Sequence, residues 1–220
     1  MLVQKLIELL APATCVGCAN EGDWLCENCR TDSIILPLPA CYRCEKLALG
    51  GATCRDCLDT GGLTRVTSGA VYQGPVKELI RILKFKRGRS AANVGAWLIL
   101  QQLPGILDID LVTAVPISPS RYRERGYNQS ELIAKIIARR IGLPYRQTLM
   151  RSTSAHQIGL GRSDRLAAIR GSFQAIRSVD GQRILVIDDV LTTGATLAEC
   201  AAVLSAAGAK SVEGATVARR

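Results

Sequence analysis

One segment near the carboxyl end constrains the fold more than any other part of the sequence: it reads Arg183-Ile-Leu-Val-Ile-Asp-Asp-Val-Leu-Thr-Thr-Gly-Ala-Thr-Leu197. Ile184 to Ile187 form a short apolar run, which is typical of a central parallel strand covered on both faces. Two carboxylates follow this run, and Thr192 to Thr196 then predict a turn into a helix that reaches about Ala207. The segment therefore predicts a strand, a loop and a helix of an α/β protein.

The loop between this strand and helix has the composition of an anion site. At such a junction, free backbone N–H groups and the positive end of the helix dipole converge, and small residues let an anion approach closely. Asp, Thr and Gly are also the usual capping and turn residues, so a purely structural turn is the alternative interpretation. Capping needs only one of these residues, whereas the segment has several. We therefore favour a phosphate site.

The two carboxylates narrow the choice of ligand. Carboxylates beside a phosphate repel a bare polyphosphate, so hydroxyl groups or a divalent cation must lie between them and the anion. A ribose 5-phosphate that carries a diphosphate supplies hydroxyls and brings Mg²⁺. The stretch from Val186 to Thr196 resembles the signature of the type I phosphoribosyltransferases, which bind 5-phosphoribosyl 1-diphosphate. The resemblance implies that Asp188 and Asp189 are catalytic and hold the ribose hydroxyls, and that the 5-phosphate is bound by Thr192, Thr193, Gly194, Ala195 and Thr196.

The cysteines predict metal sites in the amino-terminal part. A reducing cytosol does not maintain a disulfide framework, and we expect a cytoplasmic protein because Met1 to Leu10 is too short and too charged for a membrane span or a signal peptide. Eight of the nine cysteines form four Cys-x-x-Cys pairs, whose spacing favours two structural Zn²⁺ sites over redox pairs or an iron-sulfur cluster. The predicted ligands are Cys15, Cys18, Cys26, Cys29, Cys41, Cys44, Cys54 and Cys57.

Two pairings of the cysteine pairs are possible. We favour sequential pairing, in which the first two pairs bind one ion and the last two bind the other, giving a double zinc ribbon. Interleaved pairing is the alternative. Cys200 stands apart from the pairs and is expected to be a small core residue of its helix.

The charge of the chain is unevenly divided. The formal net charge is +9, but five Lys or Arg residues against eight Asp or Glu residues up to Gly62 make this part −3 and the remainder +12. The basic surface therefore belongs to the part that is expected to bind a sugar phosphate. A polyanionic substrate fits this distribution, and nucleic-acid binding is also compatible with it.

The order of the predicted elements indicates the architecture. Gly61-Gly62 separates two expected domains, residues 1–62 with an amino-terminal helix and the double zinc ribbon, and residues 63–220 with the sugar-phosphate site. Strands alternate with helices in the second domain, which predicts an α/β fold with a mainly parallel sheet and helices on both faces, similar to the type I phosphoribosyltransferases. The expected strands are 64–72, 111–115, 183–187 and 211–217, and the expected helices are 76–84, 91–103, 129–141 and 197–207.

A second segment is expected to bind the diphosphate. Pro116 closes a predicted strand, and the following residues carry Arg121, Arg123 and Arg125 into a loop before the next helix. Arginine side chains bind phosphate oxygens in bidentate fashion and stabilise the charge on a leaving diphosphate. We therefore predict that Pro116, Arg121 and Arg125 contribute to substrate binding. The alternative is a basic loop that is simply solvated.

Several motifs together resemble those of the ComF family of competence-associated proteins. They are Leu83-Lys-Phe-Lys86, Arg121 with Arg125-Gly-Tyr-Asn-Gln129, and the Arg-rich segment from Arg151 to Phe173, behind a module of four cysteine pairs. The resemblance covers nearly the whole chain and implies a zinc ribbon joined to a phosphoribosyltransferase domain, with a link to DNA uptake. The sequence departs from the family at Tyr127, where Phe is usual, and at Glu45, where Gly is common.

The segment from Arg151 to Phe173 is polar and Arg-rich, and it is expected to form a lid over the diphosphate. By the same comparison, Arg162 and Arg165 would contact the substrate once this lid closes. His156, the only histidine, lies in the same segment. Because a single loop histidine is usually incidental, we do not assign it a catalytic role.

The expected function is binding of 5-phosphoribosyl 1-diphosphate with Mg²⁺, and the expected enzyme class is a glycosyltransferase that transfers a pentosyl group. The acceptor is not indicated by any segment. The alternatives are a protein that senses the ligand without turnover and one that handles single-stranded DNA through the same pocket. An aromatic content of 4% provides few stacking platforms and argues against strong non-specific binding of single strands. The expected partner is 5-phosphoribosyl 1-diphosphate, the further candidates are single-stranded DNA and other competence proteins, and no membrane insertion is expected.

Overall fold

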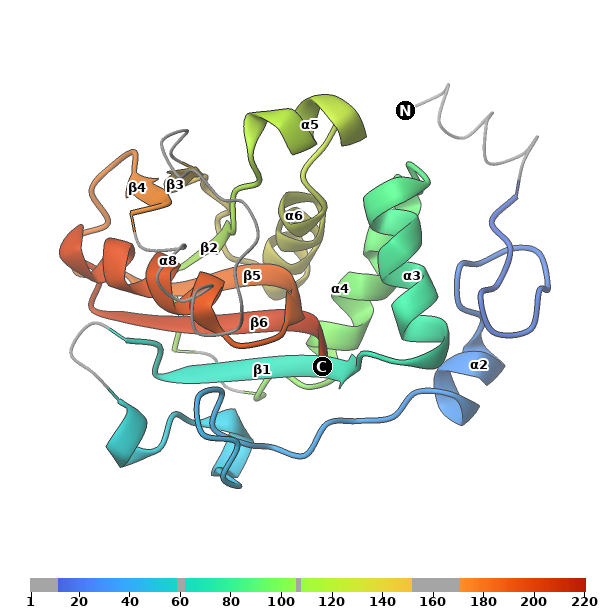
Figure 1. The fold of residues 1–220 in the computed structure, drawn as a ribbon, viewed down its shortest axis with the longest axis horizontal. Helices are drawn as coiled ribbons and strands as arrows, with labels where there is room; N and C mark the ends of the chain where they lie inside the picture. The colour runs from blue at the N-terminus through green and yellow to red at the C-terminus, as the bar shows by residue number, and fades with distance from the viewer. Residues whose placement is uncertain (1–11, 59–61, 106–107, 152–170) are drawn as a thin grey trace, which may run out of the picture.

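The centre of the molecule is a twisted parallel sheet (Figure 1). The computed structural model describes residues 12–58, 62–105, 108–151 and 171–220. Within them, four strands lie in the order β1-β6-β5-β2, and every adjacent pair is parallel. Their bounds are Arg65–Val71 for β1, Leu111–Ala114 for β2, Arg183–Leu191 for β5 and Ser211–Arg219 for β6. Because the strands are parallel, their carboxyl ends share one edge of the sheet.

Helices cover both faces of this sheet, as predicted. Helices α4 (Ala92–Leu100) and α6 (Gln129–Ile141) pack on one face, with α3 (Gly74–Phe85) beside α4, and α8 (Ala195–Ala206) packs on the other face (Figure 1). The apolar run in β5 serves both faces, since Leu185 and Ile187 belong to the core under α4 and α6 while Ile184 and Val186 belong to the core under α8. Burial of successive residues on opposite faces explains why this strand is continuously apolar.

Strand β5 is longer than the sequence analysis predicted. The apolar run ends at Ile187, yet the strand continues to Leu191 and includes both Asp188 and Asp189. The reason is the neighbouring strand, because β6 extends equally far and Asp188 pairs with Thr216 in the parallel ladder. Backbone pairing with β6 thus makes Asp188 and Asp189 part of the strand, although their polarity alone predicts a loop.

The predicted arginine loop is also partly helical. Residues Pro119–Arg125 form helix α5, which begins after Ser118 and ends at Gly126 with φ 76°. The Ser118 hydroxyl accepts a hydrogen bond from the Arg121 N–H at 3.3 Å, and proline at the first helical position fits the helix without losing a hydrogen bond. Ser118 and Gly126 therefore stabilise the two ends of a short helix, in a segment where the charge pattern predicts a loop.

Smaller elements complete the described structure. Strands β3 (Leu149–Arg151) and β4 (Phe173–Ala175) form an antiparallel pair, which the sequence analysis did not predict. The expected lid residues His156, Arg162 and Arg165 lie outside the described residues, as does the segment from Met1 to Leu10. The expected domain boundary at residue 62 stays a prediction. The remaining short helices are α2 (Glu27–Asp32), η1 (Leu49–Gly51), η2 (Arg55–Cys57) and η3 (Arg89–Ala91).

Within the described part of the chain, none of the helices has both the length and the apolar character needed to cross a bilayer.

Candidate functional site

Asp189 lies at the carboxyl end of β5 and is held by side chains from two other elements. Its carboxylate is buried and accepts a charged contact of 2.7 Å from the Lys84 ammonium group, which comes from the last turn of α3. The Gln129 side-chain amide at the start of α6 donates a hydrogen bond to the other carboxylate oxygen. Lysine and glutamine thus satisfy a buried negative charge that would otherwise be costly.

Asp188 has a different environment from its neighbour. The Ser130 hydroxyl donates to its carboxylate at 3.0 Å, and the Asp189 backbone N–H donates to the same oxygen at 2.8 Å. Burial raises the pKa of Asp188 to about 7, with the adjacent Asp189 charge adding to the rise and the hydrogen bonds and Lys84 opposing it. The site therefore contains a carboxyl group that changes charge near neutral pH.

The first turn of α6 reaches β5 because Asn128 anchors it. The Asn128 side-chain oxygen caps the helix by accepting from the Ser130 N–H at 3.1 Å, and its amide nitrogen donates to the Val115 carbonyl at 2.9 Å. Val115 directly follows β2, which pairs with β5. One buried asparagine therefore fixes both the start of α6 and its distance from the carboxylates.

Arg125 extends this network toward α5. Its guanidinium group donates to the Gln129 side-chain oxygen at 2.9 Å and lies over the Phe85 ring at 5.5 Å. The side chain is only 8% exposed, and its Nε has no hydrogen-bond partner among the described residues. A buried donor without a partner costs free energy unless an acceptor arrives, which makes Arg125 a strong candidate anion ligand.

The arginine segment contains two more residues that were predicted to bind substrate, Pro116 and Arg121, and also Tyr127, where the sequence differs from the family pattern. Pro116 is buried beyond the end of β2, whereas Arg121 is exposed on α5. Tyr127 uses the hydroxyl that distinguishes it from Phe, donating to the Leu83 carbonyl at 2.6 Å. Lys84 and Gln129 belong to the motifs that resemble the ComF family, and the sequence alone indicates no role for either residue in the site. The structure brings these motifs together with Asp189.

The predicted phosphate loop, residues 192–196, connects β5 to α8. Gly194 has φ 75° and precedes the first helical residue, and α8 has no side-chain cap at this end. The Ala195 N–H reaches only the Thr193 hydroxyl, at 3.4 Å. Thr192 is exposed, and Thr196 lies in the first helical turn. An uncapped helix start with a left-handed glycine is the backbone geometry that an anion site requires.

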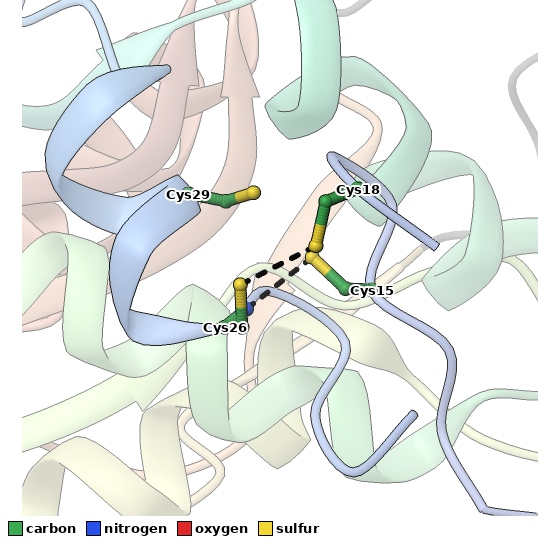
Figure 2. Close-up of side chains that lie close together, drawn as sticks. All are labelled: Cys15, Cys18, Cys26 and Cys29. Carbon is green, nitrogen blue, oxygen red and sulfur yellow. Dashed lines mark hydrogen bonds between the residues drawn. The ribbon is translucent and has the colours of Figure 1, made fainter. Parts of the chain in front are cut away.

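The cysteine side chains form two groups of four. The first cysteine group consists of Cys15, Cys18, Cys26 and Cys29, whose side chains gather in Figure 2, and the second consists of Cys41, Cys44, Cys54 and Cys57. In each group, all four sulfur atoms lie within 4.8 Å of one another. Sequential pairing is therefore confirmed, and interleaved pairing is wrong. Cys200 is fully buried in the core under α8, as predicted.

The geometry of both groups fits a tetrahedral metal site. The Cys18 and Cys26 sulfurs are 3.6 Å apart, as are those of Cys44 and Cys54, and the cysteines are free thiols. Metal-sulfur bonds of about 2.3 Å in a tetrahedron place sulfurs about 3.8 Å apart. Burial tends to raise the pKa of Cys15, but backbone N–H donors, first that of Cys26, outweigh it and lower the pKa to about 6. Thiolate ligands are favoured by such donors.

The two groups repeat one backbone pattern. The Cys15 N–H donates to the Asn20 carbonyl at 2.8 Å, and the Cys41 N–H donates to the Lys46 carbonyl at 2.9 Å. The residue after the second cysteine is left-handed in both, with φ 65° at Ala19 and 63° at Glu45. This conformation favours glycine, and Glu45 adopts it with the turn intact.

The repeats nevertheless pack against different parts of the molecule. The first group lies beside α3 and α4, where the Trp24 indole N–H donates to the Ser90 hydroxyl at 2.9 Å (Figure 1). The second group lies along β1, where the Thr53 N–H donates to the Thr64 carbonyl at 2.9 Å. Each cysteine group therefore supports a different side of the sheet domain.

The chain is similar in sequence to a known domain family and to several named proteins. The model of the phosphoribosyl transferase domain matches residues 128–220, which include Gln129, both carboxylates and the phosphate loop. The chain is 32% identical over 157 residues to the DNA utilization protein YhgH of Salmonella typhimurium, covering 68% of this chain and 69% of that protein.

Two further relatives match over most of their length. The DNA utilization protein YhgH of Escherichia coli strain K12 is 29% identical over 225 residues, covering 93% of this chain and 96% of that protein. The competence protein ComFC of Streptococcus pneumoniae is 28% identical over 197 residues, covering 88% of this chain and 87% of that protein.

Proposed function

The chain belongs to the ComF family of phosphoribosyltransferase-like proteins, and on that premise we propose that it binds 5-phosphoribosyl 1-diphosphate with Mg²⁺ at the carboxyl edge of its parallel sheet. The observation that carries this proposal is a carboxylate pair near the end of β5 that is followed, within a few residues, by the uncapped start of α8. Ligands of open parallel sheets bind at this edge. Carboxylates accept hydrogen bonds from hydroxyl groups, and free N–H groups at a helix start bind phosphate, so this pair of features offers both kinds of partner that a ribose 5-phosphate needs.

We assign each part of the substrate to one group of residues. Asp188 and Asp189 would accept hydrogen bonds from the ribose hydroxyls, and backbone N–H groups of residues 192–196 would bind the 5-phosphate. The buried Arg125, with its unpaired Nε, would bind the diphosphate together with Arg121. The Lys84 ammonium group contacts the Asp189 carboxylate at 2.7 Å in the free protein, so it would hold that side chain in place.

If turnover occurs, the reaction is transfer of the phosphoribosyl group. A nucleophile on the acceptor forms a bond to C1′ while the bond from C1′ to the diphosphate oxygen breaks, and the leaving diphosphate takes the electron pair. Positive charge develops on the ribose ring, where the two carboxylates would stabilise it. The arginines would stabilise the negative charge on the diphosphate. Positioning and electrostatics then provide the rate, without a covalent intermediate.

We further propose that both cysteine groups hold Zn²⁺ as structural sites. Among the described residues, each group offers four free thiols and no additional ligand, and closed four-cysteine sites serve structure rather than catalysis. Free thiols persist in a reducing compartment, which supports a cytoplasmic location.

Isothermal calorimetry of the zinc-loaded protein tests the proposed substrate. We expect binding of 5-phosphoribosyl 1-diphosphate that requires Mg²⁺ and is lost in Asp188→Ala and Asp189→Ala. Asp108→Asn is the control, because it removes a carboxylate from an exposed pair with Arg183. If the unmodified protein gives no heat of binding, the proposal is contradicted. It is also contradicted if the two alanine variants bind the substrate as tightly as the unmodified protein does.

A role in handling single-stranded DNA is the second candidate, and a basic groove supports it. The groove lies between α6 and the start of α4 and has a volume of about 500 Å³, with Arg89, Lys135 and Arg139 among its lining residues. The relatives are named for DNA utilization and competence, which agrees with such a role. Binding of an oligonucleotide that weakens steeply with salt and is reduced in Arg139→Ala, but not in Asp189→Ala, would support this candidate. Binding that ignores Arg139 would argue against it.

A further inference from the structure

An aromatic side chain from the second cysteine group lies against the phosphate loop. Tyr42 lies between the ligands Cys41 and Cys44 and is only 4% exposed. An added Cβ at Gly194 would lie 2.5 Å from one Tyr42 ring carbon and 3.1 Å from another. Tyr42 also belongs to the core that contains Leu191, the last residue of β5. The ring therefore packs directly against the turn that begins α8.

The end of β6 joins the same cysteine turn to the same loop. The Arg219 guanidinium group donates to the carbonyls of Ala40 and Cys41, each at 3.3 Å, and lies 3.7 Å from the Glu45 carboxylate. The next residue donates its backbone N–H to the Leu191 carbonyl at 3.0 Å. Two independent connections thus run from the second group to the start of the phosphate loop.

The first cysteine group shows that the turn of a Cys-x-x-Cys pair does not require an aromatic residue. Val16 occupies the position in the first repeat that Tyr42 occupies in the second, and the backbone hydrogen bonds of the two turns match. Val16 packs against the other core, next to α3 and α4. The large ring at residue 42 therefore serves its contact with the loop and not the geometry of the cysteine turn.

We propose that Tyr42 is a positioning residue for the phosphate loop, and that a metal ion in the second cysteine group holds Tyr42 in place. Occupancy of this group then sets the order of residues 192–196 and, through them, the affinity for the 5-phosphate. The first cysteine group has no such effect on the loop. The part of this inference that concerns affinity rests on the proposed function, whereas the part that concerns loop order does not.

Amide hydrogen exchange of the full-length, zinc-loaded protein without substrate tests loop order. In Tyr42→Ala we expect exchange of residues 191–198, among them the Ala198 amide that donates to the Gly194 carbonyl at 2.9 Å, to accelerate on the order of tenfold, because the ring that supports the turn is gone. Tyr42→Phe keeps the ring carbons at Gly194 and should restore slow exchange. Val16→Ala is the matched control in the first repeat, and it should leave exchange of these residues unchanged.

The same variants are then titrated with 5-phosphoribosyl 1-diphosphate and Mg²⁺. We expect the dissociation constant to rise roughly tenfold in Tyr42→Ala and to stay within about twofold of the unmodified protein in Tyr42→Phe and Val16→Ala. Zinc content of two per chain in all variants shows that the cysteine groups remain loaded. If Tyr42→Ala does not fold, Tyr42→Leu replaces it with a smaller apolar side chain.

The outcomes separate the two proposals. Unchanged exchange of the loop in a folded, zinc-loaded Tyr42→Ala overturns the inference, even if the substrate binds. Faster exchange of the loop with no substrate binding by the unmodified protein supports the structural part and refutes the proposed function. Equal acceleration in Val16→Ala would show a general loss of stability, and this too would overturn the inference.

Discussion

At the scale of single residues, Gly194 is a position where the structure leaves no room for a side chain. Its φ of 75° is left-handed, and a Cβ would come within 2.5 Å of the Tyr42 ring. We expect Gly194→Ala to lower the free energy of unfolding by about 2 kcal/mol or more, since it combines backbone strain with a steric clash. Denaturant unfolding measures this change.

Gly181 provides the matched control for Gly194. Its φ is 67°, and nothing lies within 4 Å of the position where a Cβ would be placed. Gly181→Ala therefore carries only the backbone strain, which costs about 1 kcal/mol. Equal losses of stability in the two variants would mean that the Tyr42 ring moves aside without cost.

Asp188 predicts a dependence of stability on pH. Its pKa is raised to about 7 in the folded protein against an ordinary value of 3.8, so between these values the folded state holds a proton that the unfolded chain has released. Stability is then lost as the pH rises through this window. We expect the melting temperature to fall between pH 5 and pH 7, and to fall less in Asp188→Asn. A variant with the same slope as the unmodified protein would contradict the prediction.

At the scale of secondary-structure elements, the start of α6 is the part that positions the site. Asn128 both caps this helix and donates to the Val115 carbonyl. We expect Asn128→Ala to cost about 1 to 2 kcal/mol of stability and also to weaken substrate binding, because Gln129 and Ser130 lose their fixed distance from the carboxylates.

Asn128→Asp separates the two roles of this side chain. Aspartate can still accept from the Ser130 N–H, but it cannot donate to Val115. We expect this variant to keep the helix cap and to lose part of the binding, as measured by circular dichroism and calorimetry. Full binding by Asn128→Asp would show that the contact with Val115 does not contribute to the site.

At the scale of the whole molecule, metal removal is expected to act locally. The two cysteine groups lie within residues 12–58, where buried apolar side chains are few, whereas the parallel sheet has large cores on both faces. We expect a chelator to accelerate amide exchange throughout residues 12–58 and in the phosphate loop that the second cysteine group supports, residues 191–196, while the rest of β5 and β6 stay protected. Loss of protection in β5 and β6 at the same chelator concentration would show that metal binding and folding of the sheet form one cooperative unit.

Local sequence patterns predicted some element bounds correctly, whereas bounds set by pairing between strands were missed. Helix α6 was predicted at its observed bounds because its apolar periodicity is a local property of residues 129–141, and the structure adds Asn128 as its cap and the left-handed Gly142 as its end. The end of β5 was predicted too early, because pairing with β6 extends the strand through two aspartates. Strands β3 and β4 are three residues each, too short to produce an alternating pattern.

By itself, the sequence determined the α/β architecture, the composition of the phosphate loop and the eight candidate metal ligands, because periodicity, capping and Cys-x-x-Cys spacing are local properties. Only the tertiary structure decided which cysteine pairs share a site, that Lys84 and Gln129 hold Asp189, and that Tyr42 supports Gly194. These contacts join residues far apart in the chain. They form because a parallel sheet brings the ends of separate strands to one edge, and no local pattern specifies which side chains meet there.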